Sequence, residues 1–586
     1  MAYDLLIKNG RVVDGSGEPA FIADVAVQDG KIVGVGKYPG AAAKRTIDAA
    51  GRVVAPGFID HHTHFDPQAV WDPYCGSWVH NGHTTVVVGQ CGQVIAPVRP
   101  GDSEWYLEFF SDAEQIPLPV LKAGVDVTWE SVGDYLNALG KKRGINVGTL
   151  VGHSGIRRYV MGEASSERQA TPEEMAAMQR LIREAMHDGA LGFSTAPKDR
   201  GDPAGVGDDA ERWALASVLG ELGTGVFQVA GGAPGGTKQT REVARQLAAR
   251  TGRPSIYNLM SDPIANPDEW VEHLRWLEDG FKSGARCYGS CLSTVAGAIF
   301  DLQRGLNVPQ DEDITHPEGI FRGMPTWDKV MALPYQERMR AFRDPALRQA
   351  LSAEAVEGTV EQQGGMTDRR GRARGFFNRR WDLVEVFMTT KGQNRHLEGK
   401  SVAQIAKEQN KGIMDAFLDL SLDEDLNTCF QAIDRNGDPK TQKHILGSQY
   451  TVIGTSDGGG RPHTADRHET STNLLGHWVR EEQVMTLEEA VYRLTGKTAL
   501  MHDITDRGFI AAGKVADITI FDPDTIASKP REPVANLPAG GVQVRRDAVG
   551  IDYVVVNGSV LLDKGELTDA LPGQIVRGPL YQGAQA

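Results

Sequence analysis

The feature that most constrains the fold of this chain is a series of eight short, apolar, β-rich runs separated by stretches with helical character. One helical stretch starts after Thr171, carries Pro172 in its first turn, and places Met178, Ile182 and Met186 on one face. Eight alternations of strand and helix predict an α/β fold, a (β/α)₈ TIM-like barrel, with its functional site at the carboxyl ends of the strands. The runs cover residues 53–60, 84–89, 145–153, 190–195, 225–231, 254–260, 285–294 and 450–457.

Both ends of the chain contain shorter β-like runs joined by turn signals. Asp29-Gly30 near the start and Asn557-Gly558 near the end are dipeptides typical of tight hairpin turns. Neither end alone buries much apolar surface, so we expect the two ends to form one small β-sandwich, with two separate β-caps as the alternative. The predicted domains are therefore the sandwich, residues 1–55 and 506–586, and the barrel, residues 56–505, with a helical insertion at about 300–449.

The composition indicates a partner that is a small molecule. Hydrophobic residues make up 40% and charged residues 24% of the 586 residues, and the net charge of -15 argues against general binding of nucleic acid or of an anionic membrane. The first residues do not resemble a signal peptide, and no apolar run approaches the roughly 20 residues that span a bilayer. Five cysteines provide no disulfide framework in so long a chain. We expect a cytoplasmic protein.

A His-x-His pattern ends the first barrel run. In a strand, residues i and i+2 face the same side, so His62 and His64 can present two imidazoles to one ion while Thr63 points away. Imidazole nitrogen suits zinc and neighbouring transition metals. Ordinary polar histidines of the core or of a loop are the alternative, but Cys91 and Asp457 end later runs and would reach the same end of a barrel. The pattern therefore predicts a metal site.

Six motifs along the chain carry a family resemblance. They are PGFIDHHTH (56–64), TTVVVGQCG (84–92), LVGHSG (150–155), GALGFST (189–195), GTSDG (454–458) and VADITIFD (515–522). With them the chain resembles the amidohydrolase superfamily, and within it the N-acyl-D-amino-acid deacylase branch. The resemblance implies that His62, His64, Cys91 and Asp457 surround a zinc centre, and that the protein forms a homo-oligomer.

Two histidines of that family are absent from this sequence. Strand five reads VFQVAGG (226–232) and strand six reads SIYNLM (255–260), and Gln228 and Asn258 align best with the missing pair. Amide oxygens are poor zinc ligands beside imidazole or thiolate, so the metal position centred on Cys91 is expected to be weakened or lost. A lysine that follows the strand-six histidine in the family is also absent. We therefore expect about one zinc ion per chain, or another divalent ion, and a preference for neutral amides over N-acyl-D-amino acids.

The remaining donors are chemically sufficient for catalysis. His62, His64 and Asp457 form a set of two imidazoles and one carboxylate that leaves a position open for water, as a catalytic zinc requires. Such an ion lowers the pKa of water towards about 7 and polarises a carbonyl. Asp457 would take the proton from the attacking water and pass it to the leaving nitrogen; the alternative is a turn or helix-cap aspartate.

Five residues are candidates for substrate contacts. His153, at the end of strand three, either stabilises an oxyanion as a catalytic residue or caps its loop. His463 and Arg467 either bind substrate, together with Gln228 and Asn258, or pack in their loop. The sequence predicts a metal-dependent amidohydrolase that cleaves a non-peptide carbon–nitrogen bond in a small N-acyl or amide substrate. The alternatives are lactone hydrolysis or decarboxylation on the same scaffold, and a binding protein without catalysis.

Overall fold

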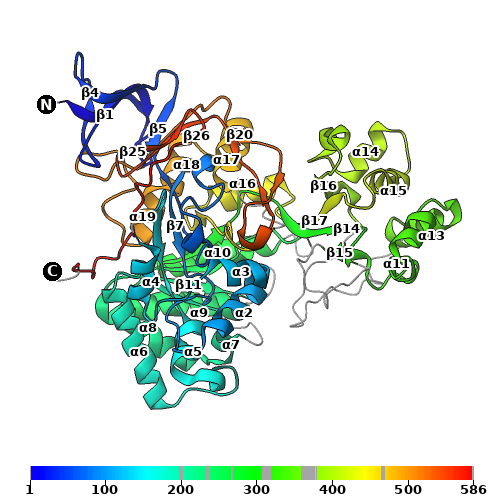
Figure 1. Ribbon diagram of the computed structural model, residues 1–586, viewed down its shortest axis with the longest axis horizontal. Coiled ribbons are helices and arrows are strands. Elements are labelled where there is room, and N and C mark those ends of the chain that lie inside the picture. Colours follow the sequence, from blue (N-terminus) through cyan, green and yellow to red (C-terminus); the bar gives the residue numbers. More distant parts are fainter. Residues whose placement is uncertain are drawn as a thin grey trace. The chain divides into compact units, whose positions relative to one another are not determined.

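The computed structural model describes residues 2–140, 142–196, 202–231, 238–264, 268–306, 319–357, 377, 379–462 and 469–583 (Figure 1). The chain divides into two compact units. The first comprises Met1–Met260, Val271–Thr294 and Lys443–Ala586, and the second comprises Ser261–Trp270 and Val295–Gln442. Within the described residues, no helix combines the length and the apolar character that a membrane crossing requires.

The first unit is built around parallel strands. One sheet has the order β6-β7-β8 and another has the order β18-β13-β12-β11-β10-β9, with parallel pairing throughout. Only Leu150 separates β8 from β9, so these two strands form one path across both sheets. The strands are β6 (Phe58–Asp60), β7 (His83–Val88), β8 (Asn146–Thr149), β9 (Val151–Gly152), β10 (Gly192–Thr195), β11 (Val226–Ala230), β12 (Ser255–Asn258), β13 (Cys287–Cys291) and β18 (Thr451–Ile453).

The ring of strands closes between the segments that follow β6 and β18. The His64 backbone N–H donates to the Gly458 carbonyl at 2.6 Å, and the Asp457 N–H donates to the His62 carbonyl at 3.3 Å. Each of the eight predicted runs contributes to this ring, and the α/β prediction is confirmed. The helices between and after the strands include α2 (Ser103–Glu114), α3 (Leu118–Gly124), α4 (Val132–Leu139), α5 (His153–Met161), α6 (Pro172–His187), α8 (Asp209–Leu222), α9 (Lys238–Thr251), α10 (Glu269–Lys282), α18 (Leu487–Leu494) and α19 (Gly496–Met501).

Helix α6 begins where the sequence predicts. The Thr171 hydroxyl accepts the backbone N–H of Glu174, and the Glu174 carboxylate accepts the N–H of Thr171, so two of the otherwise unpaired donors of the first turn are satisfied. Met178, Ile182 and Met186 are buried on its inner face. The apolar face and the capping pair together fix the start and the orientation of this helix.

The first predicted run divides at Gly57. Its first half, β5 (Val53–Pro56), belongs to the sheet of the chain ends, and its second half is β6 of the ring. A Cβ atom at position 57 would lie 2.2 Å from the Thr84 side chain, so only glycine allows the backbone to pass this close to β7. Sequence periodicity predicts one strand here because both halves are equally apolar.

Strands from both ends of the chain form one nine-stranded sheet, which confirms the predicted union of the ends (Figure 1). The junction is the antiparallel pair of β5 and β19, in which Pro56 lies opposite Ile518. The predicted domain boundaries at residues 55 and 505 stay a prediction. The sheet consists of β1 (Tyr3–Val12), β2 (Phe21–Gln28), β3 (Lys31–Gly36), β4 (Ala43–Asp48), β5, β19 (Ile518–Phe521), β24 (Ile551–Val556), β25 (Ser559–Asp563) and β26 (Glu566–Leu567).

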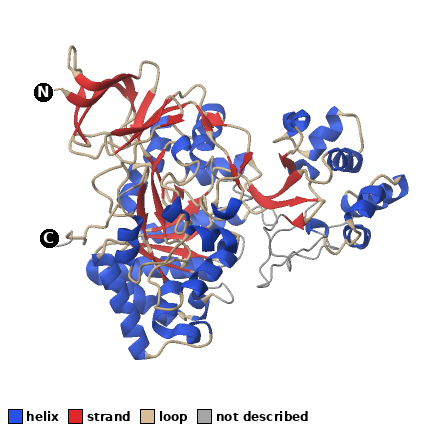
Figure 2. Cartoon of the chain, in the orientation of Figure 1, coloured by secondary structure: helices blue, strands red, loops and turns tan. Residues whose placement is uncertain are grey.

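The second unit contains both helices and strands (Figure 2). Its aromatic core includes Phe321 stacked on Trp327, with ring centroids 3.8 Å apart, and Phe417 against Phe430 at 4.7 Å. The sequence predicts the helices here but not the four-stranded antiparallel sheet. The elements are β14 (Ala296–Asp301), β15 (Gly305–Leu306), β16 (Val384–Met388), β17 (Cys429–Arg435), α11 (Pro325–Met331), α12 (Tyr335–Ala341), α13 (Pro345–Ala355), α14 (Val402–Glu408) and α15 (Ile413–Asp423).

Candidate metal centre

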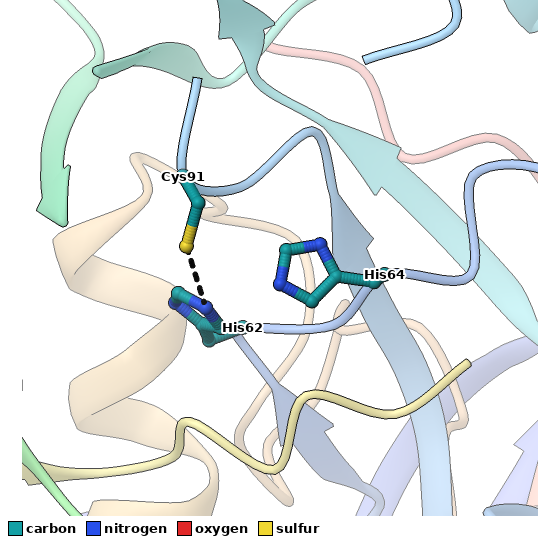
Figure 3. Close-up of side chains that lie close together, drawn as sticks. All are labelled: His62, His64 and Cys91. Atoms are coloured by element: carbon teal, nitrogen blue, oxygen red, sulfur yellow. Dashed lines mark hydrogen bonds between the residues drawn. The ribbon is translucent and has the colours of Figure 1, made fainter. Parts of the chain in front are cut away.

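Two histidines and a cysteine meet at the carboxyl ends of β6 and β7 (Figure 3). His62 and His64 follow β6, and both are almost fully buried. Cys91 lies in the turn after β7, where its Sγ atom is 3.4 Å from His62 Nε2. One donor atom from each of the three residues lies within 4.8 Å of the other two. His62 and His64 therefore present their rings to the same point, as the His-x-His spacing predicts.

Asp457 brings a carboxylate to the same point from the segment after β18. Its Oδ1 atom lies 3.3 Å from His62 Nε2 and 3.9 Å from His64 Nε2. Two ligand atoms that are each about 2.1 Å from one ion are about 3 to 4 Å apart when they subtend 90° to 140° at it. Most hydrogen bonds between such atoms are shorter, about 2.7 to 3.2 Å. The spacing of these donors therefore fits shared coordination of one ion.

The protonation of His62 also suits a metal ligand. Burial lowers the pKa of His62, and the carboxylate of Asp457 opposes this shift only in part. The neutral imidazole is the form that binds a metal ion. The donor set and its burial are thus compatible with zinc.

Gln228 and Asn258, the two amides expected at the positions of the absent histidines, lie beside this cluster. Gln228, on β11, accepts the backbone N–H of Cys91 through Oε1 at 2.7 Å. Asn258, the last residue of β12, places Nδ2 3.0 Å from His62 Nδ1 and 3.1 Å from His62 Nε2. Within the described residues, Gln228 Nε2 and Asn258 Oδ1 have no hydrogen-bond partner. Gln228 can therefore donate a further hydrogen bond and Asn258 can accept one, and the role of both residues in substrate binding stays a prediction.

Two side chains, one from β10 and one from the segment after β6, fix the turn that carries Cys91. The Ser194 hydroxyl, on β10, donates to the Gly89 carbonyl at 2.6 Å and accepts the Gly92 N–H at 2.9 Å. Asp66 Oδ1 accepts the Gly89 N–H at 2.9 Å. Cys91 itself has a φ of 58°, a left-handed backbone conformation that residues other than glycine seldom adopt unless the surroundings enforce it. Sequence reasoning missed Ser194 and Asp66, because their contacts depend on the packing of strands that are distant in the sequence.

A buried carboxylate also joins the segments that close the ring. Asp60 accepts hydrogen bonds from Trp78 Nε1 at 2.7 Å, from Ser456 Oγ at 2.5 Å and from the His62 N–H at 3.2 Å. Burial raises the pKa of Asp60, and the three donors counteract that effect. Asp60 therefore positions the histidines and the Asp457 segment relative to each other.

His153 lies in a separate buried network. Its Nδ1 atom is 2.9 Å from Thr195 Oγ1, and its Nε2 atom is 2.7 Å from Glu211 Oε1, which also pairs with Arg157. Both ring nitrogens thus contact protein groups, and a catalytic role for His153 stays a prediction. His463 and Arg467 lie outside the described residues.

The fold and the cluster define an α/β protein with a ring of eight parallel strands and a candidate metal centre at their carboxyl ends. The chain belongs to the amidohydrolase family, whose profile matches residues 45–283 and 440–562. This membership confirms the resemblance inferred from the motifs.

Curated relatives match over almost the whole chain. D-aminoacylase of Alcaligenes xylosoxydans xylosoxydans is 28% identical over 583 residues, which cover 98% of this chain and 97% of the relative. N-acyl-D-glutamate deacylase of the same organism is 27% identical, with 98% and 96% covered.

Solved structures share the fold. N-acyl-D-glutamate deacylase of Bordetella bronchiseptica, complexed with zinc and a phosphonate inhibitor that mimics the tetrahedral intermediate, is 25% identical, with a TM-score of 0.63 and 98% and 100% of the two chains covered. A D-aminoacylase structure at 24% identity has a TM-score of 0.62 and covers 98% of this chain and 99% of that chain.

Proposed function

We propose that the protein is a metal-dependent hydrolase that cleaves a carbon–nitrogen bond other than a peptide bond in a small N-acyl or amide substrate. The observation that carries the proposal is the convergence of His62, His64, Cys91 and Asp457 at distances of 3.3 to 3.9 Å for the pairs given above. In the proposal these four residues hold one zinc ion. Gln228 and Asn258 provide neutral amides where two histidines would complete a second metal position.

The chemistry divides between the ion and the protein. Zinc, when bound, would polarise the scissile carbonyl and lower the pKa of a water molecule. The Asp457 carboxylate accepts a proton as the water oxygen attacks the carbonyl carbon, and then delivers that proton to the leaving nitrogen as the carbon–nitrogen bond breaks. The products are a carboxylic acid and an amine. Arg461 Nη1 donates to Asp457 Oδ2 at 3.2 Å, which orients the carboxylate.

The relatives suggest the substrate class. The names of D-aminoacylase and N-acyl-D-glutamate deacylase indicate N-acylated D-amino acids for those two enzymes. We infer an N-acyl or simple amide substrate for this chain. Neutral amides are expected to be the better substrates, because an unpaired carboxylate entering a partly desolvated site without the family's lysine is costly. Matched substrate pairs that differ only in the carboxylate test this preference through kcat/KM.

Metal analysis and product analysis of one preparation test the proposal. Protein purified without chelators should contain about one zinc ion per chain by mass spectrometry and should release amine from members of an amide library. His62→Ala should lose both the zinc and most of the turnover, whereas the control His187→Ala, at an exposed position of α6, should retain both. A metal-free protein whose turnover is unchanged by chelation would contradict the metal-dependent mechanism. Turnover without amine release would indicate another reaction on the same scaffold.

A further inference from the structure

A buried carboxylate that belongs to no motif of the sequence lies next to His64. Glu114 is the last residue of α2 and has only 3% of its side chain exposed. Its Oε1 atom lies 3.7 Å from His64 Nε2. Phe110, one turn earlier in α2, packs edge-on against the His64 ring with centroids 6.3 Å apart. The end of α2 is therefore held against the His64 side of the candidate metal centre.

The segment after β18 is shaped to receive this carboxylate. A Cβ atom at Gly460 would lie 2.6 Å from Glu114 Oε2, so a larger residue at 460 would displace the carboxylate from this position. The Arg461 backbone N–H donates to the Glu114 carbonyl at 2.7 Å. The same segment carries Asp457, so one stretch of five residues positions both carboxylates.

The distances on the His64 side resemble those on the His62 side. His64 Nε2 is 3.7 Å from Glu114 Oε1 and 3.9 Å from Asp457 Oδ1, and both values lie in the range of about 3 to 4 Å expected for ligands of one ion. Both exceed the usual length of a direct hydrogen bond, which is about 2.7 to 3.2 Å. The buried position of Glu114 and these distances fit an oxygen ligand of the same ion.

We propose that Glu114 is a further metal ligand, which reaches the centre from α2 and replaces part of the donor strength lost with the strand-five and strand-six histidines. The inference rests on the proposed metal centre. It adds an oxygen donor to the His64 side, so that His64, Asp457 and Glu114 coordinate the ion together. Carboxylate ligands also suit manganese, so the site should accept manganese as well as zinc.

Two substitutions separate coordination from charge alone. Glu114→Gln keeps the shape but removes the negative charge, and Glu114→Asp keeps the charge but withdraws the oxygens by one methylene. The control is Glu108→Gln, which removes an exposed carboxylate from the same helix. Zinc affinity is measured by competition with a chromophoric chelator, and the zinc-dependent rise in Tm is measured on metal-free and zinc-loaded protein.

If Glu114 is a ligand, both Glu114 variants should bind zinc at least about tenfold more weakly, and their zinc-dependent rise in Tm should shrink while the Tm of the metal-free protein changes little. Glu108→Gln should match the wild type. Wild-type affinity in Glu114→Asp would reduce the role of Glu114 to electrostatics, and wild-type affinity in both variants would exclude it from the centre. In either case the proposed hydrolase stands if the wild type binds zinc and releases amine, whereas a wild type without zinc refutes both proposals.

Discussion

Replacing Gln228 by alanine tests whether the amide on β11 holds the cysteine of the centre in place. Gln228 Oε1 accepts the Cys91 N–H at 2.7 Å, and the substitution leaves this partly buried donor without its acceptor. An unsatisfied buried N–H costs about 1 to 3 kcal/mol, and the half-buried position of Cys91 places the cost near the lower end of that range.

The expected effect falls on metal affinity. Ser194 and Asp66 still anchor both flanks of the turn, so the turn should persist while the Cys91 backbone relaxes from its φ of 58°. The substitution should destabilise the backbone conformation that points Cys91 Sγ towards the centre by about 1 to 2 kcal/mol. Zinc affinity should then fall about 5- to 30-fold. Chelator competition measures the change.

Two further variants make this result interpretable. Gln228→Glu keeps an acceptor at the same position, so zinc affinity should be retained or increased. Gln179→Ala removes an amide that donates to the Ala214 carbonyl from α6, and it should leave zinc affinity unchanged. A zinc affinity of Gln228→Ala within about twofold of the wild type would refute the positioning role, as would equal losses in Gln228→Ala and Gln228→Glu.

Three other outcomes follow from the structure. Asp457→Asn should lower kcat by about 10² to 10⁴, with bound zinc measured in the same sample to separate lost proton transfer from lost metal. Combining Gln228→His with Asn258→His should raise the zinc content from about one to about two ions per chain by mass spectrometry, and an unchanged content would show that these amides do not occupy ligand positions. Burial lowers the pKa of His83 to about 4, so the stability that its neutral ring provides above pH 6.5 is lost as the pH falls towards 4. The full loss in the free energy of unfolding is about 3 kcal/mol. Urea titrations at pH 7.5 and pH 4.5 should show a smaller loss for His83→Gln than for the wild type. Equal losses would contradict the lowered pKa of His83.

The strands and the core of the site could be predicted because they depend on local patterns. Apolar β-rich runs mark the strands, and the period of two in a strand places His62 and His64 on one side without knowledge of the rest of the fold. The position of Cys91 and Asp457 at strand ends then follows from the parallel arrangement.

Residues whose placement depends on tertiary packing could not be predicted in this way. Glu114 lies at the end of α2, and only the path of that helix brings it to His64. His153 follows a strand in the sequence but is the first residue of α5, so the alternation of the strand does not set the direction of its side chain. The sheet of the second unit joins β16 and β17 across 40 intervening residues, a non-local pairing without a turn signal.

The closure of the strand ring has a consequence for the biosynthesis of the protein. The hydrogen bonds that close it join the segment around His62 to the segment around Asp457, which lie at opposite ends of the barrel sequence. At about 5 to 20 residues per second, the ribosome adds Asp457 roughly 20 to 80 seconds after His62. During that interval the nascent chain presents His62, His64 and Cys91 without the carboxylate that completes the centre. In the proposed centre, metal loading would therefore belong to the last stage of folding, and a bound ion would link the two segments whose hydrogen bonds close the ring.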